Sequence, residues 1–109
     1  MRKTVARNAR TSGANRKLVL RLYVAGAAPH STRALENVRA ICELHVGNKY
    51  ELDVVDVLHE PLRALDDGIL VTPTLVRLDP KPVKTLIGDL SEQTLVLTTL
   101  GLSARGAST

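Results

Sequence analysis

The sequence has few of the residues on which common site chemistries depend. Its only aromatic residues are Tyr23 and Tyr50, and its only cysteine is Cys42. A lone cysteine excludes an intramolecular disulfide and a Cys-x-x-Cys redox or zinc motif. Two tyrosines cannot supply a row of stacking platforms for nucleic-acid bases. The core must therefore be built from Leu, Val, Ile and Ala side chains.

Signatures of nucleotide hydrolysis and of membrane insertion are also missing. No Gly-rich loop ends in Gly-Lys-Ser or Gly-Lys-Thr, and no serine lies in a nucleophile-elbow sequence. The longest apolar run, 18–28, is interrupted by Arg21 and is far shorter than the roughly 20 residues of a membrane span. The basic N-terminus is not followed by the apolar segment of a secretory signal. We therefore expect a soluble, cytoplasmic protein that does not hydrolyse nucleotides.

Charge is distributed unevenly along the 109 residues. Residues 1–17 carry six basic residues and no acid, whereas the remainder has nine basic residues against eleven acids, a net charge of −2. Residues 1–16 are also polar and aperiodic, so they cannot bury enough apolar surface to offset the entropy of ordering. We expect a disordered basic arm over 1–16, one folded domain over 17–102 and a flexible tail over 103–109.

The first half of the folded domain predicts two strands with a helix between them. The nearly continuous apolar segment 17–25 is typical of a buried strand. Ser31 is suited to cap a helix that ends before Gly47, and the helix has one apolar face. That face consists of Ala34, Leu35, Val38, Ile41, Cys42 and His45. A second strand is expected over 49–57.

The second half predicts a short helix, two strands and a closing helix. Pro61 suits a first helical turn, and Leu62 with Leu65 forms a short apolar stripe before Gly68. Residues 69–77 and 83–87 indicate an antiparallel hairpin around a proline-rich turn at 78–82. A closing helix is expected to follow a cap at Ser91. The order strand, helix, strand, helix, strand, strand, helix, with a parallel first pair and an antiparallel second pair of strands, is what an α/β, thioredoxin-like fold requires. Other α/β arrangements are compatible with the same pattern.

Five stretches resemble the KaiB family of circadian clock proteins. They are LYVAG at 22–26, Pro29 with Ser31 and RAL at 33–35, VDVL at 55–58, TPTL at 72–75 and IGDLS at 87–91. They occur in the family's order and extend the resemblance over about residues 17–102.

The resemblance implies a thioredoxin-like fold without thioredoxin chemistry. A thioredoxin places two cysteines where the first strand meets the first helix, because that helix end lowers the thiolate pKa. Residues 27–30 of this chain, Ala-Ala-Pro-His, occupy those positions. Thr72 and Pro73 match the thioredoxin proline that is usually cis, so we expect Pro73 to be cis; an ordinary trans turn is the alternative.

The resemblance also implies a function. Members of the family are regulatory proteins that bind the hexameric ATPase KaiC, compete with a sensor kinase domain and recruit a further clock component. The implied protein is not an enzyme and needs no cofactor. It forms homo-oligomers (dimers or tetramers) and serves a circadian clock, a timer or a stress response. The family is metamorphic, so an alternative KaiB-type βαββααβ fold is implied. The run 94–99 is compatible with both folds, because it alternates as a strand does while Leu90, Leu97 and Leu100 suit a helix.

Two sets of site residues follow from the resemblance. The partner-binding set matches basic positions of the family and consists of Arg21, Arg33, Arg77 and Lys84; arginine suits interfaces because its planar fork holds carboxylates. Isolated surface charges are the alternative interpretation of each. The structural or switch set consists of Pro73, Gly88 and Asp89. Thr85 stands where cyanobacterial members typically carry a second basic residue.

Two further functions remain as alternatives. One is a thiol-dependent, thioredoxin-like oxidoreductase that uses Cys42, which lacks a resolving partner. The other is nucleic-acid binding through the basic arm, whose charge is suited to phosphates. The spacing of Cys42 and His45 is compatible with half a metal site, but core packing is favoured because only two ligands are local.

Overall fold

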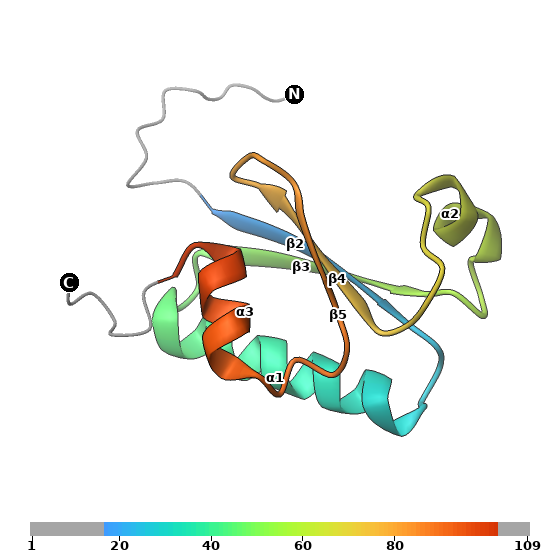
Figure 1. The fold of residues 1–109 in the computed structure, drawn as a ribbon, viewed down its shortest axis with the longest axis horizontal. Helices are drawn as coiled ribbons and strands as arrows, with labels where there is room; N and C mark the ends of the chain where they lie inside the picture. Colours follow the sequence, from blue (N-terminus) through green and yellow to red (C-terminus); the bar gives the residue numbers. More distant parts are fainter. Residues whose placement is uncertain (1–16, 103–109) are drawn as a thin grey trace.

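A computed structural model describes residues 17–102, which form a four-stranded sheet and three helices (Figure 1). The strands are β2 (Leu18–Val24), β3 (Tyr50–Asp56), β4 (Thr74–Asp79) and β5 (Lys84–Ile87). The helices are α1 (Pro29–His45), α2 (Pro61–Asp66) and α3 (Gln93–Leu100). The expected order of elements is confirmed. The arm and the tail expected at 1–16 and 103–109 lie outside the described residues.

The sheet has the order β3-β2-β4-β5, with β2 as an inner strand. β2 is parallel to β3, in a register that pairs Leu18 with Tyr50 and Val24 with Asp56. β4 is antiparallel to both β2 and β5. This is the combination of a parallel first pair and an antiparallel second pair that the sequence predicts.

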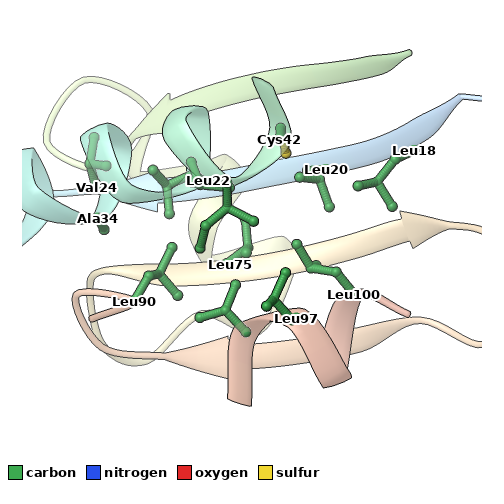
Figure 2. Packing of buried hydrophobic residues seen from close by; sticks show 13 residues of the cluster. Leu18, Leu20, Leu22, Val24, Ala34, Cys42, Leu75, Leu90, Leu97 and Leu100 are labelled. Atoms are coloured by element: carbon green, nitrogen blue, oxygen red, sulfur yellow. The ribbon is translucent and has the colours of Figure 1, made fainter. Parts of the chain in front are cut away.

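Helices α1 and α3 lie on the same side of the sheet, which we call the covered face (Figure 1). Alternate side chains of β2 point to this face because strand residues alternate between faces. Between the sheet and these helices, apolar side chains and the Cys42 thiol pack into one core cluster (Figure 2). Its buried members are Leu18, Leu20, Leu22, Val24, Ala34, Val38, Ile41, Cys42, Leu75, Leu90, Val96, Leu97 and Leu100. The apolar faces predicted for both helices are thus confirmed, except that His45 of α1 is not part of this core.

The other side of the sheet, the open face, has only a small core. Tyr23, Val55 and Val76 are buried there, and α2 contributes the buried Ala64. The prediction that Leu62 and Leu65 form the packed side of α2 is wrong, because these side chains are 74% and 69% exposed. In this two-turn helix the small Ala64 is the buried residue.

The start of α1 differs from the expectation. The helix begins at Pro29 with Ala28 at its N-cap, so Ser31 is not the cap. Proline suits this first position because its missing N–H has no partner in the helix. Ser31 is buried inside the first turn, and its Oγ accepts a hydrogen bond from the backbone N–H of Ala25 at 3.0 Å. The serine therefore joins the strand end to the helix.

Two elements near the C-terminus begin later than expected. β4 starts at Thr74, not at residue 69, because Pro73 has no N–H with which to pair in a sheet. The Thr72–Pro73 peptide bond is cis, as expected, and so are the bonds preceding Pro80 and Pro82. α3 starts at Gln93, not directly after Ser91, because the N–H of Ser91 is bound by Asp89 Oδ1 at 3.1 Å in a local turn.

Candidate partner-binding surface

A groove on the open face lies between the β4–β5 hairpin and the connection from α2 to β4. Its volume is about 380 Å³. The register pairs Val76 with Thr85 and Thr74 with Ile87, which places these side chains on one face. The open-face groove is lined by Arg21, Tyr23, Asp67, Gly68, Ile69, Leu70, Val71, Thr74, Val76, Leu78, Val83, Thr85 and Ile87. Most of these side chains are apolar, so the groove is better suited to bind an apolar surface of a partner than a charged one.

The end of the groove nearest α2 is polar and internally paired. Tyr23 donates its hydroxyl hydrogen to Asp67 Oδ2, and Arg21 Nη1 lies 3.5 Å from the same oxygen. Burial raises the pKa of Tyr23, and the bond to Asp67 adds to this effect, so the phenol remains protonated as a donor. Arg21 Nε donates to Asp53 Oδ2 at 3.0 Å.

Asp53 also connects the sheet to α2. Its Oδ2 accepts a hydrogen bond from Arg63 Nη2, while Arg63 Nη1 donates to Glu60 at 3.3 Å. Exposed ion pairs contribute little individually, but a network that shares one carboxylate fixes the position of its members. The network therefore holds α2 beside the groove even though α2 buries little apolar surface.

Three exposed leucines, Leu58, Leu62 and Leu65, lie in and just before α2, and we call them the α2 apolar stripe. Leu62 and Leu65 are three residues apart and so share one side of the helix, whereas Leu58 lies in the turn before it. All three are more than two-thirds exposed. Leu70, which lines the groove just after α2, is 90% exposed. Clustered exposed apolar side chains usually mark an interaction site. The excess of leucine in a two-turn helix was the signal for this surface, but sequence reasoning assigned it to packing.

The structure does not bring the four predicted partner-binding residues together. Arg21 lies on the open face. Arg33 lies on α1, where its Nε is 3.4 Å from Asp89 Oδ2. Arg77 and Lys84 are opposite each other across β4 and β5 and face the covered side with Leu75 and Leu86. The partner-binding roles of Arg21, Arg33 and Lys84 stay predictions.

Arg77 departs from the expected exposed charge, because only 6% of it is accessible. Its Nη2 donates to the carbonyl oxygen of Pro82 at 2.8 Å, which ties the strand to the proline-rich turn. A Cβ on Gly101, at the C-cap of α3, would lie 3.1 Å from Arg77 Nη1. Within the described chain, Arg77 Nε has no hydrogen-bond partner. Arg77 on β4 is thus buried beside the C-terminal end of α3, and its partner-binding role also stays a prediction.

The predicted switch residues meet in the loop between β5 and α3. The N–H of Gly88 donates to the carbonyl of Pro73 at 3.0 Å, and Asn37 Nδ2 of α1 donates to the carbonyl of Asp89 at 2.8 Å. Hydrogen bonds from Ser91, and then Arg33, lower the pKa of the Asp89 carboxyl. The loop thus touches α1 and the cis-proline segment. Its role in switching stays a prediction.

Cys42 is fully buried within α1 and faces the core (Figure 2). Burial raises the pKa of its thiol to about 11, so almost no thiolate forms at neutral pH. His45 lies on the same helix, but across residues 17–102 no group of three or more His, Cys, Asp or Glu side chains is placed to hold a metal ion. The junction of β2 and α1 carries Ala27, Ala28, Pro29 and His30 where a thioredoxin has its Cys-x-x-Cys motif.

Among the described helices, none combines the length and the apolar character needed to cross a membrane. The longest is α1, which has 17 residues and several charged ones.

A family model and curated relatives both match this chain over most of its length. The family model described as KaiB domain matches residues 21–102. A circadian clock oscillator protein KaiB of Prochlorococcus marinus is 47% identical over 89 residues, which cover 82% of this chain and 85% of the relative. The circadian clock protein KaiB3 of Synechocystis sp. is 39% identical over 90 residues, covering 83% and 88% of the two chains.

Solved structures show the same fold at lower sequence identity. The N-terminal domain of SasA from Synechococcus elongatus has a TM-score of 0.67 at 24% identity and covers 91% of this chain and 93% of its own. The germline thioredoxin Deadhead from Drosophila melanogaster has a TM-score of 0.64 at 18% identity, with coverages of 86% and 89%. The fold is therefore thioredoxin-like, as the sequence predicts.

Proposed function

This chain belongs to the KaiB family, and from this membership we propose that it is a non-enzymatic regulator that binds a hexameric, KaiC-like ATPase. Relatives that match most of its length are named circadian clock proteins. The buried, protonated Cys42 and the alanines at the β2–α1 junction favour a binding role over thiol chemistry. The fold that it shares with the SasA N-terminal domain is compatible with competition between this chain and a sensor domain for one ATPase surface.

The docking surface is the open face. It comprises the open-face groove and the α2 apolar stripe, with Arg21 and Arg63 between them. The observation that carries this assignment is the exposure of Leu62, Leu65 and Leu70 beside a sheet whose other side is sealed by two helices. A protein–protein contact usually has an apolar centre and a polar rim, and arginine is enriched in it.

A co-elution experiment tests the partner. The full chain is incubated for hours with the cognate KaiC-like ATPase and ATP, in both its phosphorylated and its dephosphorylated form, and the mixture is separated by size. A complex that contains this chain and the hexamer supports the proposal. Two separate peaks under every condition would reject it. Long incubation is needed because slow conformational steps take minutes or longer.

The proposal extends to conformational switching, in which the loop of Gly88 and Asp89, Pro73 and the run 94–99 rearrange into the alternative fold. The ambiguity of that run is what supports it, since α3 is short and buries only Val96, Leu97 and Leu100. Two slowly exchanging sets of amide resonances, or a second oligomeric species, would be expected. A single set with one mass across temperature and concentration would contradict it.

Three further parts of the proposal concern context. We assign the protein to the cytoplasm, with a clock, timer or stress pathway as its output and homo-oligomers as its assembly. We also propose the domain boundaries given above: a basic arm over 1–16, a folded domain over 17–102 and a tail over 103–109. Analytical ultracentrifugation of the full chain tests the assembly, because a monomer at every concentration would contradict it.

A further inference from the structure

The chain enters the sheet next to one end of the open-face groove. β2 begins at Leu18, and the register pairs Val19 with Asp79 at the end of β4. Leu78 and Val83, beside that end of β4, line the groove. The segment that precedes Leu18 therefore leaves the sheet at the groove's entrance, and the apolar lining begins within a few residues of it.

The preceding segment is long enough to cross the groove. β4 has six residues and spans about 20 Å at 3.3 Å per residue. Six extended residues, 11–16, cover the same length, and 16 residues reach up to about 53 Å. Residues 11–14 are Thr, Ser, Gly and Ala, which are small enough to lie in a shallow groove. If this segment were extended along the groove, its length would bring Arg10 and Arg7 to the far end, beside α2.

The far end of the groove carries the complementary charge. Asp66 and Asp67 end α2 and Glu60 precedes it. Within residues 17–102, Asp66 forms no ion pair, and the other two acids share Arg21 and Arg63. Residues 1–16 contain five basic residues and no acid. By contrast, the exposed side of α1 mixes both signs, with Arg33, Glu36, Arg39 and Glu43.

We propose that residues 1–16 dock in cis along the open-face groove, with Arg7 and Arg10 against the acidic end of α2. The contact is chiefly electrostatic and is therefore weakened by salt. It covers the surface assigned above to the partner, so the arm acts as an intramolecular competitor. That regulatory consequence rests on the proposed function, whereas the docking itself is a property of this chain alone.

Paramagnetic relaxation in the full chain tests the docking. A nitroxide is attached at Ser12→Cys; the native thiol does not compete, because Cys42 is fully buried with a pKa of about 11. The expected result is broadening of the amide signals of Leu70, Thr85 and Ile87, with Glu36 and Arg39 of α1 unaffected. The broadening is expected to fade at roughly 1 M salt, where screening is effective within about 3 Å. No broadening on the open face, or equal broadening on α1, would overturn the proposal.

Two controls separate docking in cis from its alternatives. In the first control, isotope-labelled chain without nitroxide is mixed with unlabelled chain that carries it. Broadening in this mixture as strong as in the single chain would mean that a second copy supplies the arm, and would overturn docking in cis.

The other control compares charge reversals of equal size. Arg7→Glu with Arg10→Glu is expected to reduce arm occupancy about tenfold, because both proposed ion pairs are lost and replaced by repulsion.

Arg2→Glu with Lys3→Glu is the matched pair, because these residues lie beyond the groove in the proposed register. It is expected to retain most of the broadening. Equal losses from the two pairs would show attraction by charge alone and would overturn the register. Partner association provides an independent readout, because deletion of residues 1–16 is expected to accelerate it if the proposed function holds. Failure of that readout while the relaxation data hold would reject the partner surface and leave the docking intact.

Discussion

On the side of the sheet covered by α1 and α3, Leu20, Leu22 and Val38 are fully buried, whereas on the opposite side Leu70 and Ile87 are mostly exposed. The two faces use the same residue types for different purposes. Burial of leucine and valine on the covered face removes apolar surface from water and stabilises the fold. Exposure of the same side chains on the open face gives no such stabilisation, which is why we assign them to binding.

The largest expected effect separates the faces by stability. Leu22→Ala leaves a cavity in the covered face and should lower the free energy of unfolding by about 2–5 kcal/mol. Ile87→Ala, on the open face, should change it by no more than about 0.5 kcal/mol. Urea unfolding followed by circular dichroism measures both. Similar losses from the two substitutions would contradict the division between the faces.

A second prediction uses the buried thiol to probe how dry the covered face is. The pKa of Cys42 is raised to about 11 in the folded chain, whereas an unfolded thiol titrates near its ordinary value. A raised pKa stabilises the fold below the unfolded value, and this stability is lost as the pH rises toward 11. We expect roughly 2 kcal/mol of loss across this range, at about 1.4 kcal/mol per pH unit.

The matched protein is Cys42→Ala, which lacks the thiol and should lose correspondingly less stability between pH 9 and 11. The pKa of Tyr23 on the open face is raised as well, but the tyrosine is present in both proteins and cancels in their difference. Unfolding curves at several pH values provide the measurement. Parallel pH dependences would show that water reaches Cys42.

A third prediction tests the buried guanidinium at the end of α3. Gly101 has φ +81°, and an added Cβ would lie 3.1 Å from Arg77 Nη1. Gly101→Ala should therefore cost about 1 kcal/mol or more, from backbone strain plus crowding. Gly47→Ala is the control, since Gly47 has φ +62° with nothing within 4 Å of the added Cβ. Thermal unfolding that ranks the two substitutions equally would show that Arg77 moves aside without cost.

Much of the covered face could be predicted from the sequence. The spacing of Ala34, Val38, Ile41 and Cys42 identified the buried side of α1, because a long helix repeats its pattern several times. Gly47, with φ +62°, lies just beyond the helix end that it was expected to mark. The cis bond before Pro73 followed from the resemblance, which the family match confirms.

The open face was predicted poorly for physical reasons. Leu62 and Leu65 have the spacing of a packed stripe, but a two-turn helix gives too few repeats to show which side turns inward. An arginine in a strand is expected at the surface. Only the tertiary structure reveals that the Arg77 side chain is buried and donates to the carbonyl oxygen of Pro82. The groove is lined by residues from β2, β4, β5 and the connection after α2. These segments are far apart in the sequence, so no local sequence pattern predicts that they form one groove.

The measurement that tests the central claim most directly compares two equally exposed leucines on opposite sides of the molecule. Leu62 on α2 and Leu44 on α1 are 74% and 75% exposed, so Leu62→Asp and Leu44→Asp should disturb stability alike. Affinity for the KaiC-like hexamer, measured with the full chain, should fall by at least about tenfold for Leu62→Asp, a loss of about 1.4 kcal/mol, and stay unchanged for Leu44→Asp. Unchanged affinity for Leu62→Asp, or an equal loss for both, would contradict the assignment of binding to the open face.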